Sequence, residues 1–203
     1  MKKYINEFIG TFFLVLTIAL TGNPIAIGFV LTVLVYMGGY ISGAHYNPAV
    51  TLAMLLVKKI DKGEAMKYII AQLLGGFIAA GIFYLIHGSN FMPAIDVNAS
   101  WSSAFLLEVL FTFLLASVVL NVAATDKTKG NDYFGLAIGM TVLVGAFAAG
   151  PISGGVFNPA VAVGPMLIDI GHIGTHLNNL IIYIIAQSLG AALAATVYKL
   201  KFV

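Results

Sequence analysis

The sequence predicts an all-α polytopic membrane protein with six transmembrane helices and two re-entrant half-helices, arranged as an inverted 3+3 repeat. Three observations predict this class. Of the 203 residues, 60% are hydrophobic and only 9% are charged, which lies outside the range of soluble domains. Six apolar segments approach the length that a bilayer-spanning helix needs. The decapeptide ISGAHYNPAV at 41–50 recurs as ISGGVFNPAV at 152–161, with seven of ten positions identical.

Two of the links between the six apolar segments, at Gly22-Asn23 and near residues 125–132, are short and polar. The segments cover residues 4–21, 24–40, 65–86, 101–124, 133–149 and 177–200. No shift in composition marks a second domain, so we expect one transmembrane domain over residues 1–203, with internal repeats over approximately 1–97 and 98–203. Three spans per repeat is an odd number, and the two repeats therefore cross the membrane in opposite directions.

Both decapeptides contain the triplet Asn-Pro-Ala, which has a mechanical interpretation. The triplets are Asn47-Pro48-Ala49 and Asn158-Pro159-Ala160. Asn is a preferred N-cap, and Pro is favoured at the first helical position because its missing N–H is not needed there. We therefore predict short helices over 47–57 and 158–168. At 1.5 Å per residue each is roughly 16 Å long, about half of a hydrocarbon core.

A glycine-bearing run that does not fit a helix precedes each triplet. Irregular backbone at membrane depth is tolerated only where it is buried in protein or lines a watery cavity. We therefore expect both runs to line a cavity toward which the half-helix N-termini point. The candidate lining residues are Gly43, Ala44, His45, Gly154 and Val156.

The basic residues predict the orientation in the membrane. All ten are lysine, and in a six-span arrangement all ten fall on one side. The opposite links, 87–100 and 150–176, contain none. Because cytoplasmic loops carry the excess of basic residues, both termini are predicted to be cytoplasmic. The compact links favour a prokaryotic cytoplasmic membrane.

Two Asn-Pro-Ala half-helices among six spans, with Glu-x-x-x-Thr at Glu7 and again at Glu108, resemble the aquaporin, or major intrinsic protein, family. The resemblance covers essentially the whole chain. It implies an aquaporin-like fold, a passive channel and a homotetramer with one pore per chain. It also implies that Glu7 and Glu108 accept hydrogen bonds from the loop backbone, and that His45 lies beside the pore.

Asn47 and Asn158 are the first candidates for contact with a solute. Meeting N-cap to N-cap, their amides can donate hydrogen bonds at the narrow midplane, and the two positive helix ends repel cations there. The alternative is that each Asn only caps its half-helix. Glu7 and Glu108 carry a second alternative, because charges in apolar spans are costly and often functional. They could titrate in an ion-coupled transporter.

The departure from the family lies in the outer filter. Counting from the Asn-Pro-Ala motifs places the four filter positions at Ile27, Ala146, Gly155 and Val161. Water-selective relatives usually have an aromatic, a His, a small residue and an Arg there, and this chain contains no arginine. A slip in spacing, or a lysine in the role of Arg, is the alternative. The filter is expected to be wide and apolar, with a weakened barrier to protons and cations.

We therefore predict a passive channel for water, with other small uncharged solutes possible. A facilitator mainly for another neutral solute (glycerol, urea, ammonia or a peroxide) is the main alternative, and a structural or adhesive membrane protein is a further one. Cysteine is absent, and neither a metal-spaced cluster nor a soluble domain is present, so no enzyme, cofactor or nucleic-acid partner is expected. The expected partners are water, small neutral solutes and the lipid bilayer.

Overall fold

The structure, a computed structural model, describes residues 1–202, apart from the side chains at 170, 173, 175, 201 and 202. The lysine at 201 is predicted to close the last span, and its side chain lies outside the described part. Residue 203 lies wholly outside it. The described elements are α1 (Lys2–Thr21), α2 (Pro24–Ser42), α3 (Pro48–Leu56), α4 (Lys62–His87), α5 (Trp101–Ala123), η1 (Asp126–Thr128), α6 (Phe134–Ser153), α7 (Pro159–Ile168), η2 (Ile170–His172) and α8 (Ile173–Phe202).

Within the described chain, six helices are long and apolar enough to cross a membrane: α1, α2, α4, α5, α6 and, within α8, His176–Leu200. This confirms the six predicted spans. The main difference is α6, which continues to Ser153, four residues past its predicted end. Gly150-Pro151 looks like a helix break, but a proline in the last turn removes only one backbone hydrogen bond. Gly154, at φ 86°, ends the helix and donates its N–H to the Gly150 carbonyl.

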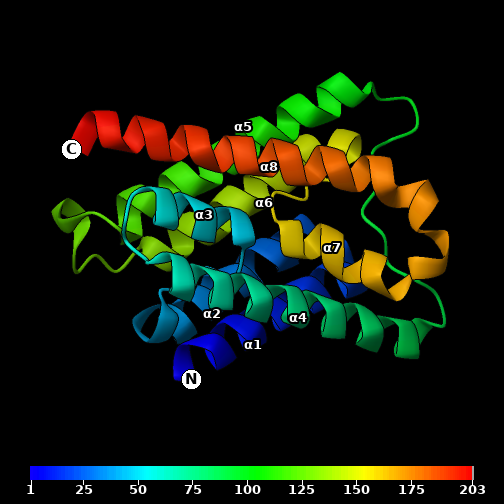
Figure 1. Cartoon of the computed structure of the whole chain (residues 1–203), viewed down its shortest axis with the longest axis horizontal. Coiled ribbons are helices and arrows are strands. Elements are labelled where there is room, and N and C mark those ends of the chain that lie inside the picture. The colour runs from blue at the N-terminus through cyan, green and yellow to red at the C-terminus, as the bar shows by residue number, and fades with distance from the viewer. Residues whose placement is uncertain (203) are drawn as a thin grey trace.

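The two short helices α3 and α7 enter from opposite ends and meet near the centre of the molecule (Figure 1). Each half of the chain forms a three-helix layer: α1 packs against α2 and α4, and α5 packs against α6 and α8. Contact between α2 and α6 joins the halves on one side. On the other side the half-helices cross over, because α7 packs mainly against α4, and α3 packs most closely against α8.

Glycines allow the closest of these helix contacts. A Cβ on Gly75 would lie 2.6 Å from the Phe8 carbonyl oxygen of α1, and one on Gly190 would lie 2.5 Å from the Val109 carbonyl oxygen of α5. In the same way, a Cβ on Gly76 would lie 2.6 Å from the carbonyl oxygen of Ala160 in α7. Small residues of this kind let membrane helices approach backbone to backbone. The contact at Gly76 sets how closely α7 approaches α4.

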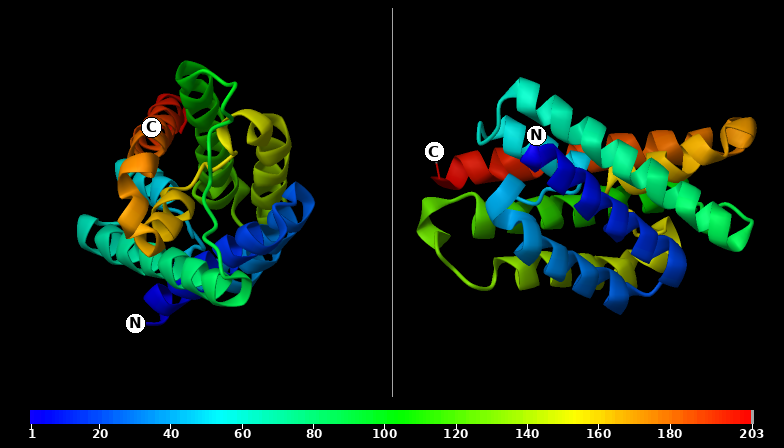
Figure 2. Two further views of the ribbon diagram at one scale, coloured as in Figure 1. Left: turned by 90° about the vertical axis from the view of Figure 1, so that its right-hand side faces the viewer. Right: turned by 90° about the horizontal axis from the view of Figure 1, so that it is seen from below.

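The segments that carry the lysines gather at one end of the molecule. The start of α1, the α3–α4 link, the α5–α6 link and the end of α8 all lie toward the left of Figure 1. We call this the lysine end and the opposite one the lysine-free end. Seen from the lysine-free end, the helices form a ring, and the link between α4 and α5 crosses its centre (Figure 2, left).

Candidate functional site

Asn47 and Asn158 connect the two half-helices where they meet. Asn47 Oδ1 accepts a hydrogen bond from the backbone N–H of Ala49 at 2.8 Å, and Asn158 Oδ1 accepts one from Ala160 at 3.0 Å. Each side chain also reaches across the midplane. Asn47 Nδ2 donates to the Phe157 carbonyl at 2.8 Å, and Asn158 Nδ2 donates to the Tyr46 carbonyl at 3.0 Å. Since an amide nitrogen carries two hydrogens, one donor per Asn is left over.

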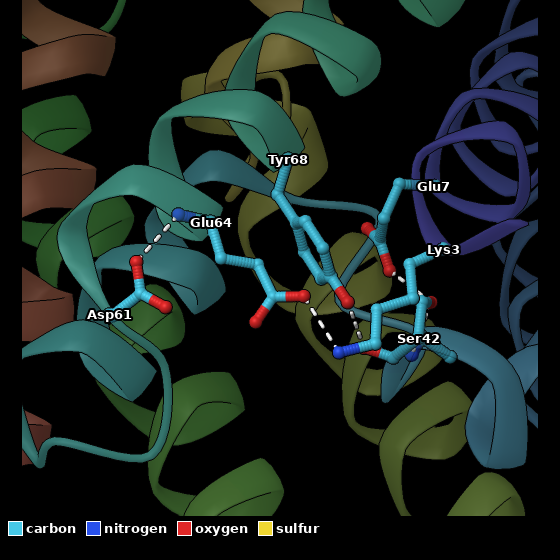
Figure 3. Close-up of polar contacts among 7 residues, drawn as sticks. Lys3, Glu7, Ser42, Asp61, Glu64 and Tyr68 are labelled. Atoms are coloured by element: carbon cyan, nitrogen blue, oxygen red, sulfur yellow. Dashed lines mark hydrogen bonds and ion pairs between the residues drawn. The ribbon is translucent and has the colours of Figure 1, made fainter. Parts of the chain in front are cut away.

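Glu7 holds the first re-entrant loop in place. Its carboxylate is fully buried and accepts four hydrogen bonds. Oε1 accepts from the Ser42 hydroxyl at 2.5 Å and from the His45 backbone N–H at 3.0 Å. Oε2 accepts from the Tyr46 N–H at 2.7 Å and from the Gln72 side chain at 2.8 Å. Figure 3 shows Glu7 beside Ser42, whose carbonyl accepts a further hydrogen bond from the Tyr68 hydroxyl.

Glu108 repeats this arrangement in the second half. It too is fully buried. Oε1 accepts from Ser153 Oγ at 2.7 Å and from the Val156 N–H at 2.9 Å. Oε2 accepts from the Phe157 N–H at 2.8 Å and from Gln187 Nε2 at 2.9 Å. With four donors around each carboxylate, both acceptors are satisfied, as buried charges require.

The carboxylates stabilise a backbone that would otherwise be unfavourable. Ala44, Tyr46 and Phe157 all have φ near +50°, a left-handed conformation that costs a non-glycine residue roughly 1–2 kcal/mol. The hydrogen bonds from Tyr46 and Phe157 to the two carboxylates oppose this cost. Gly154 and Gly155 adopt positive φ as well, at no such cost.

A cavity of about 450 Å³ runs past the meeting point of the half-helices. It extends from Gly22 and Pro24, at the lysine-free end, to Val119 and Ile138. Val119 lies four residues before the end of α5, and Ile138 lies four residues after the start of α6. At 1.5 Å per residue these positions are about 6 Å from the helix ends. The cavity therefore follows most of the length of the spans.

The structure brings most of the predicted site residues to this cavity. Its lining includes both asparagines, all four predicted filter positions and most of the predicted loop residues: Asn47, Asn158, Ile27, Ala146, Gly155, Val161, Ala44, His45, Gly154 and Val156. The lining does not include Gly43, the Pro and Ala residues of the two triplets, Glu7 or Glu108. Both carboxylates thus lie behind the wall of the cavity, among the groups that hold its loops.

The wall of the cavity is mostly aliphatic. Beyond the filter positions it is formed by residues such as Leu14, Leu31, Val50, Leu115, Ile138 and Val142. Among the described residues, His45 is the only ionisable side chain in the lining. Its ring is held by a 3.1 Å hydrogen bond between Nδ1 and Thr51 Oγ1. Polar contact with a solute would therefore come from the two asparagines, His45 and the loop backbone.

Sequence reasoning missed two groups of residues. Phe91 and Pro93, in the link between α4 and α5, line the cavity, but an irregular link has no periodicity that could reveal this. Asn6 was also missed. Its side chain donates to Ser42 Oγ at 2.7 Å and to Tyr46 Oη at 3.0 Å, behind the first loop. A polar residue in an apolar span was the available signal.

Comparison with known proteins places the chain in a family. The chain matches the family model described as major intrinsic protein over residues 1–198. It is 38% identical to "Glycerol uptake facilitator protein-like 6" of Lactiplantibacillus plantarum, with 96% of this chain and 95% of that protein covered. It is 34% identical to Nodulin-26 of Glycine max, with 98% and 78% covered. An X-ray structure of the aquaglyceroporin from Plasmodium falciparum superposes with a TM-score of 0.83 at 22% identity, covering 97% of this chain and 94% of that one.

Proposed function

Because the chain belongs to the major intrinsic protein family, whose members are channels for water and small neutral solutes and not enzymes, we propose that its pore passes water together with neutral solutes of about the size of glycerol. The pore is the cavity described above. Its outer filter is formed by Ile27, Ala146, Gly155 and Val161. We further propose that this protein assembles as a homotetramer with one pore per chain, and that it lies in a prokaryotic cytoplasmic membrane with both termini in the cytoplasm.

The observation that carries this proposal is the composition of the cavity wall. Both asparagines face a continuous cavity whose filter positions carry only small or aliphatic side chains. A small polyol has an apolar carbon edge and a row of hydroxyls. The first can contact the aliphatic wall, and the second can meet the spare asparagine donors and the loop carbonyls. The relative from Lactiplantibacillus plantarum, named for glycerol uptake, supports a solute of this kind.

The buried carboxylates do not favour the ion-coupled alternative. Neither Glu7 nor Glu108 lines the cavity, and each already accepts four hydrogen bonds. A proton-coupled site needs a carboxylate that the solute pathway can reach. In both halves the carboxylate instead holds the loop that forms the pathway.

Stopped-flow light scattering of proteoliposomes in a glycerol gradient tests the proposal. Fast shrinkage reports water leaving, and subsequent re-swelling reports glycerol entering. We expect both phases to be faster than in empty liposomes. Shrinkage without accelerated re-swelling would restrict the pore to water, and equality with empty liposomes in both phases would contradict the channel assignment.

A substitution in the filter links the flux to this cavity. Ala146→Phe places a large ring at a filter position. We expect it to lower glycerol permeability more strongly than water permeability. Val144→Phe is the matched control. Val144 is 54% exposed on the same helix and does not line the cavity, so this variant should conduct like the unmodified protein.

A further inference from the structure

The link between α4 and α5 lies over the lysine-free end of the cavity. It crosses the centre of the helical ring (Figure 2, left). Two close approaches join it to the end of α6 and to the start of the second re-entrant loop. The Asp96 backbone N–H donates to the Ile152 carbonyl at 3.0 Å, and a Cβ on Gly154 would lie 2.9 Å from the Ala94 carbonyl oxygen. The link is therefore part of the wall at the filter.

Phe91 is the aromatic side chain that this link contributes to the cavity. It lines the cavity together with Val156 and Val161, and it packs against the apolar cluster that contains both valines. Val161 is only 2% exposed. Phe91 thus shares a cavity and an apolar cluster with the filter position at which the chain has valine.

The ring of Phe91 has an aromatic partner, and the residue before it is also held. The ring meets Phe83 of α4 edge to face, with centroids 6.1 Å apart, and Phe83 stacks on His87 at 4.4 Å. The side chain of Asn90 donates a hydrogen bond to the Asp169 carboxylate. Asp169 follows α7 and is also bonded to His172 Nδ1 at 2.8 Å. The aromatic contact and the anchored neighbour restrict the movement of Phe91.

We propose that Phe91 is a fifth residue of the outer filter and sets the upper size limit for neutral solutes. This inference rests on the proposed channel function. The four filter positions deduced from the motifs leave a wide opening, because their side chains are small or aliphatic. A rigid ring at the same level narrows this opening. Phe83 acts as a positioning residue, since it contacts the ring of Phe91 and does not line the cavity.

The test is the permeability of proteoliposomes to a series of polyols, glycerol, erythritol and ribitol, each divided by the water permeability of the same preparation. For Phe91→Ala we expect the relative permeability to the smallest polyol that the unmodified protein excludes to rise by about tenfold, equivalent to roughly 1.4 kcal/mol off the barrier. Phe91→Trp, with a larger ring, is expected to shift the limit the other way and to lower glycerol permeability.

Two further variants separate a filter role from a general effect on the link. Phe83→Ala should raise the size limit as Phe91→Ala does. Phe83→Trp keeps an aromatic contact and should have the size limit of the unmodified protein. Val97→Ala is the control within the same link. Val97 is 94% exposed and does not line the cavity, so its size limit should not change.

The outcomes distinguish this inference from the proposed function. If the unmodified protein conducts and neither Phe91→Ala nor Phe91→Trp changes the order or limit of polyol permeability, the filter role of Phe91 is wrong and the channel stands. If the unmodified protein does not conduct, the channel function itself fails. Should Phe91→Ala not fold, the opposite shift expected of Phe91→Trp decides the question.

Discussion

The two carboxylate sites are the same in both halves, but the residues around them differ in a correlated way. In the first half, Tyr46 has a hydroxyl that donates to the Leu34 carbonyl and accepts from Asn6. At the equivalent places the second half has Phe157 and Leu107, and Phe157 instead packs against Phe111, with ring centroids 5.5 Å apart. The first half thus has both the tyrosine hydroxyl and its asparagine partner, and the second half has neither. This avoids an unsatisfied buried polar group.

Replacing the buried carboxylate by an amide should destabilise the protein strongly. In Glu7→Gln one oxygen becomes an NH₂ group, so two of the four donors around it lose their acceptor. At roughly 1–3 kcal/mol for each unsatisfied buried donor, we expect a loss of roughly 2–6 kcal/mol, and a similar loss for Glu108→Gln. Thermal unfolding in detergent micelles measures this effect.

The same chemical change at the surface provides the control. Glu64 forms a 2.7 Å ion pair with Lys3, and both side chains are partly exposed. Such pairs contribute about 0–1 kcal/mol to stability. The unfolding temperature of Glu64→Gln should therefore be close to that of the unmodified protein. Equal losses for Glu7→Gln and Glu64→Gln would contradict the bracing role of the buried carboxylate.

One pair breaks the correlation, and it makes a second prediction. Thr51 Oγ1 donates to Gln72 Oε1 at 3.4 Å, whereas the second half has Ala162 at the equivalent place and the Oε1 atom of Gln187 is buried without a partner. Ala162→Thr supplies a hydroxyl. Compared with Ala162→Val, which has the same shape, it should be more stable by about 1 kcal/mol. Equal melting temperatures for these two variants would show that the hydroxyl does not reach Gln187.

At the scale of the elements, the short helices were the most predictable part of the chain. The structure has α3 over Pro48–Leu56 and α7 over Pro159–Ile168, each capped by the predicted Asn. Asn and Pro determine these starts through local backbone chemistry, which a sequence displays directly. The end of α6 and the placement of Phe91 depend on contacts with distant segments. No local pattern encodes them.

The glycine contacts make a prediction about how the elements pack. Gly76 and Gly81 lie in the same helix, α4, but a Cβ would be 2.6 Å from the Ala160 carbonyl oxygen at Gly76 and 3.6 Å from a flexible Ile168 side chain at Gly81. Gly76→Ala should therefore push α7 away and cost about 1–3 kcal/mol. Gly81→Ala should be neutral or stabilise by up to about 1 kcal/mol. Unfolding curves that rank these two variants the other way would refute the close crossing of α4 and α7.

For the whole molecule, the main consequence of the cavity lining is electrostatic. Among the described residues, no lysine, aspartate or glutamate lines the cavity. Exclusion of cations then rests on the positive N-termini of α3 and α7 and on the two asparagines. The proposed filter adds no fixed positive charge to this barrier.

Adding a charge at the filter should strengthen the barrier. In Val161→Arg we expect proton flux under a pH gradient to fall by at least about tenfold, because a fixed cation nearby repels a passing one by several kcal/mol. Glycerol flux should fall as well, and water flux should persist. Val161→Met controls for added bulk without charge. Proteoliposomes of the unmodified protein that leak protons no faster than empty ones would show that the half-helices alone suffice.

The crossed packing of the half-helices has a consequence for synthesis. Since α3 packs most closely against α8, and α7 mainly against α4, neither half can complete its own interior. During synthesis α3 is made before its main partner, α8, which begins more than one hundred residues later in the chain. The packing of α3 is therefore completed only after α8 has been made. A chain truncated before α8 would lack the helix against which α3 packs most closely.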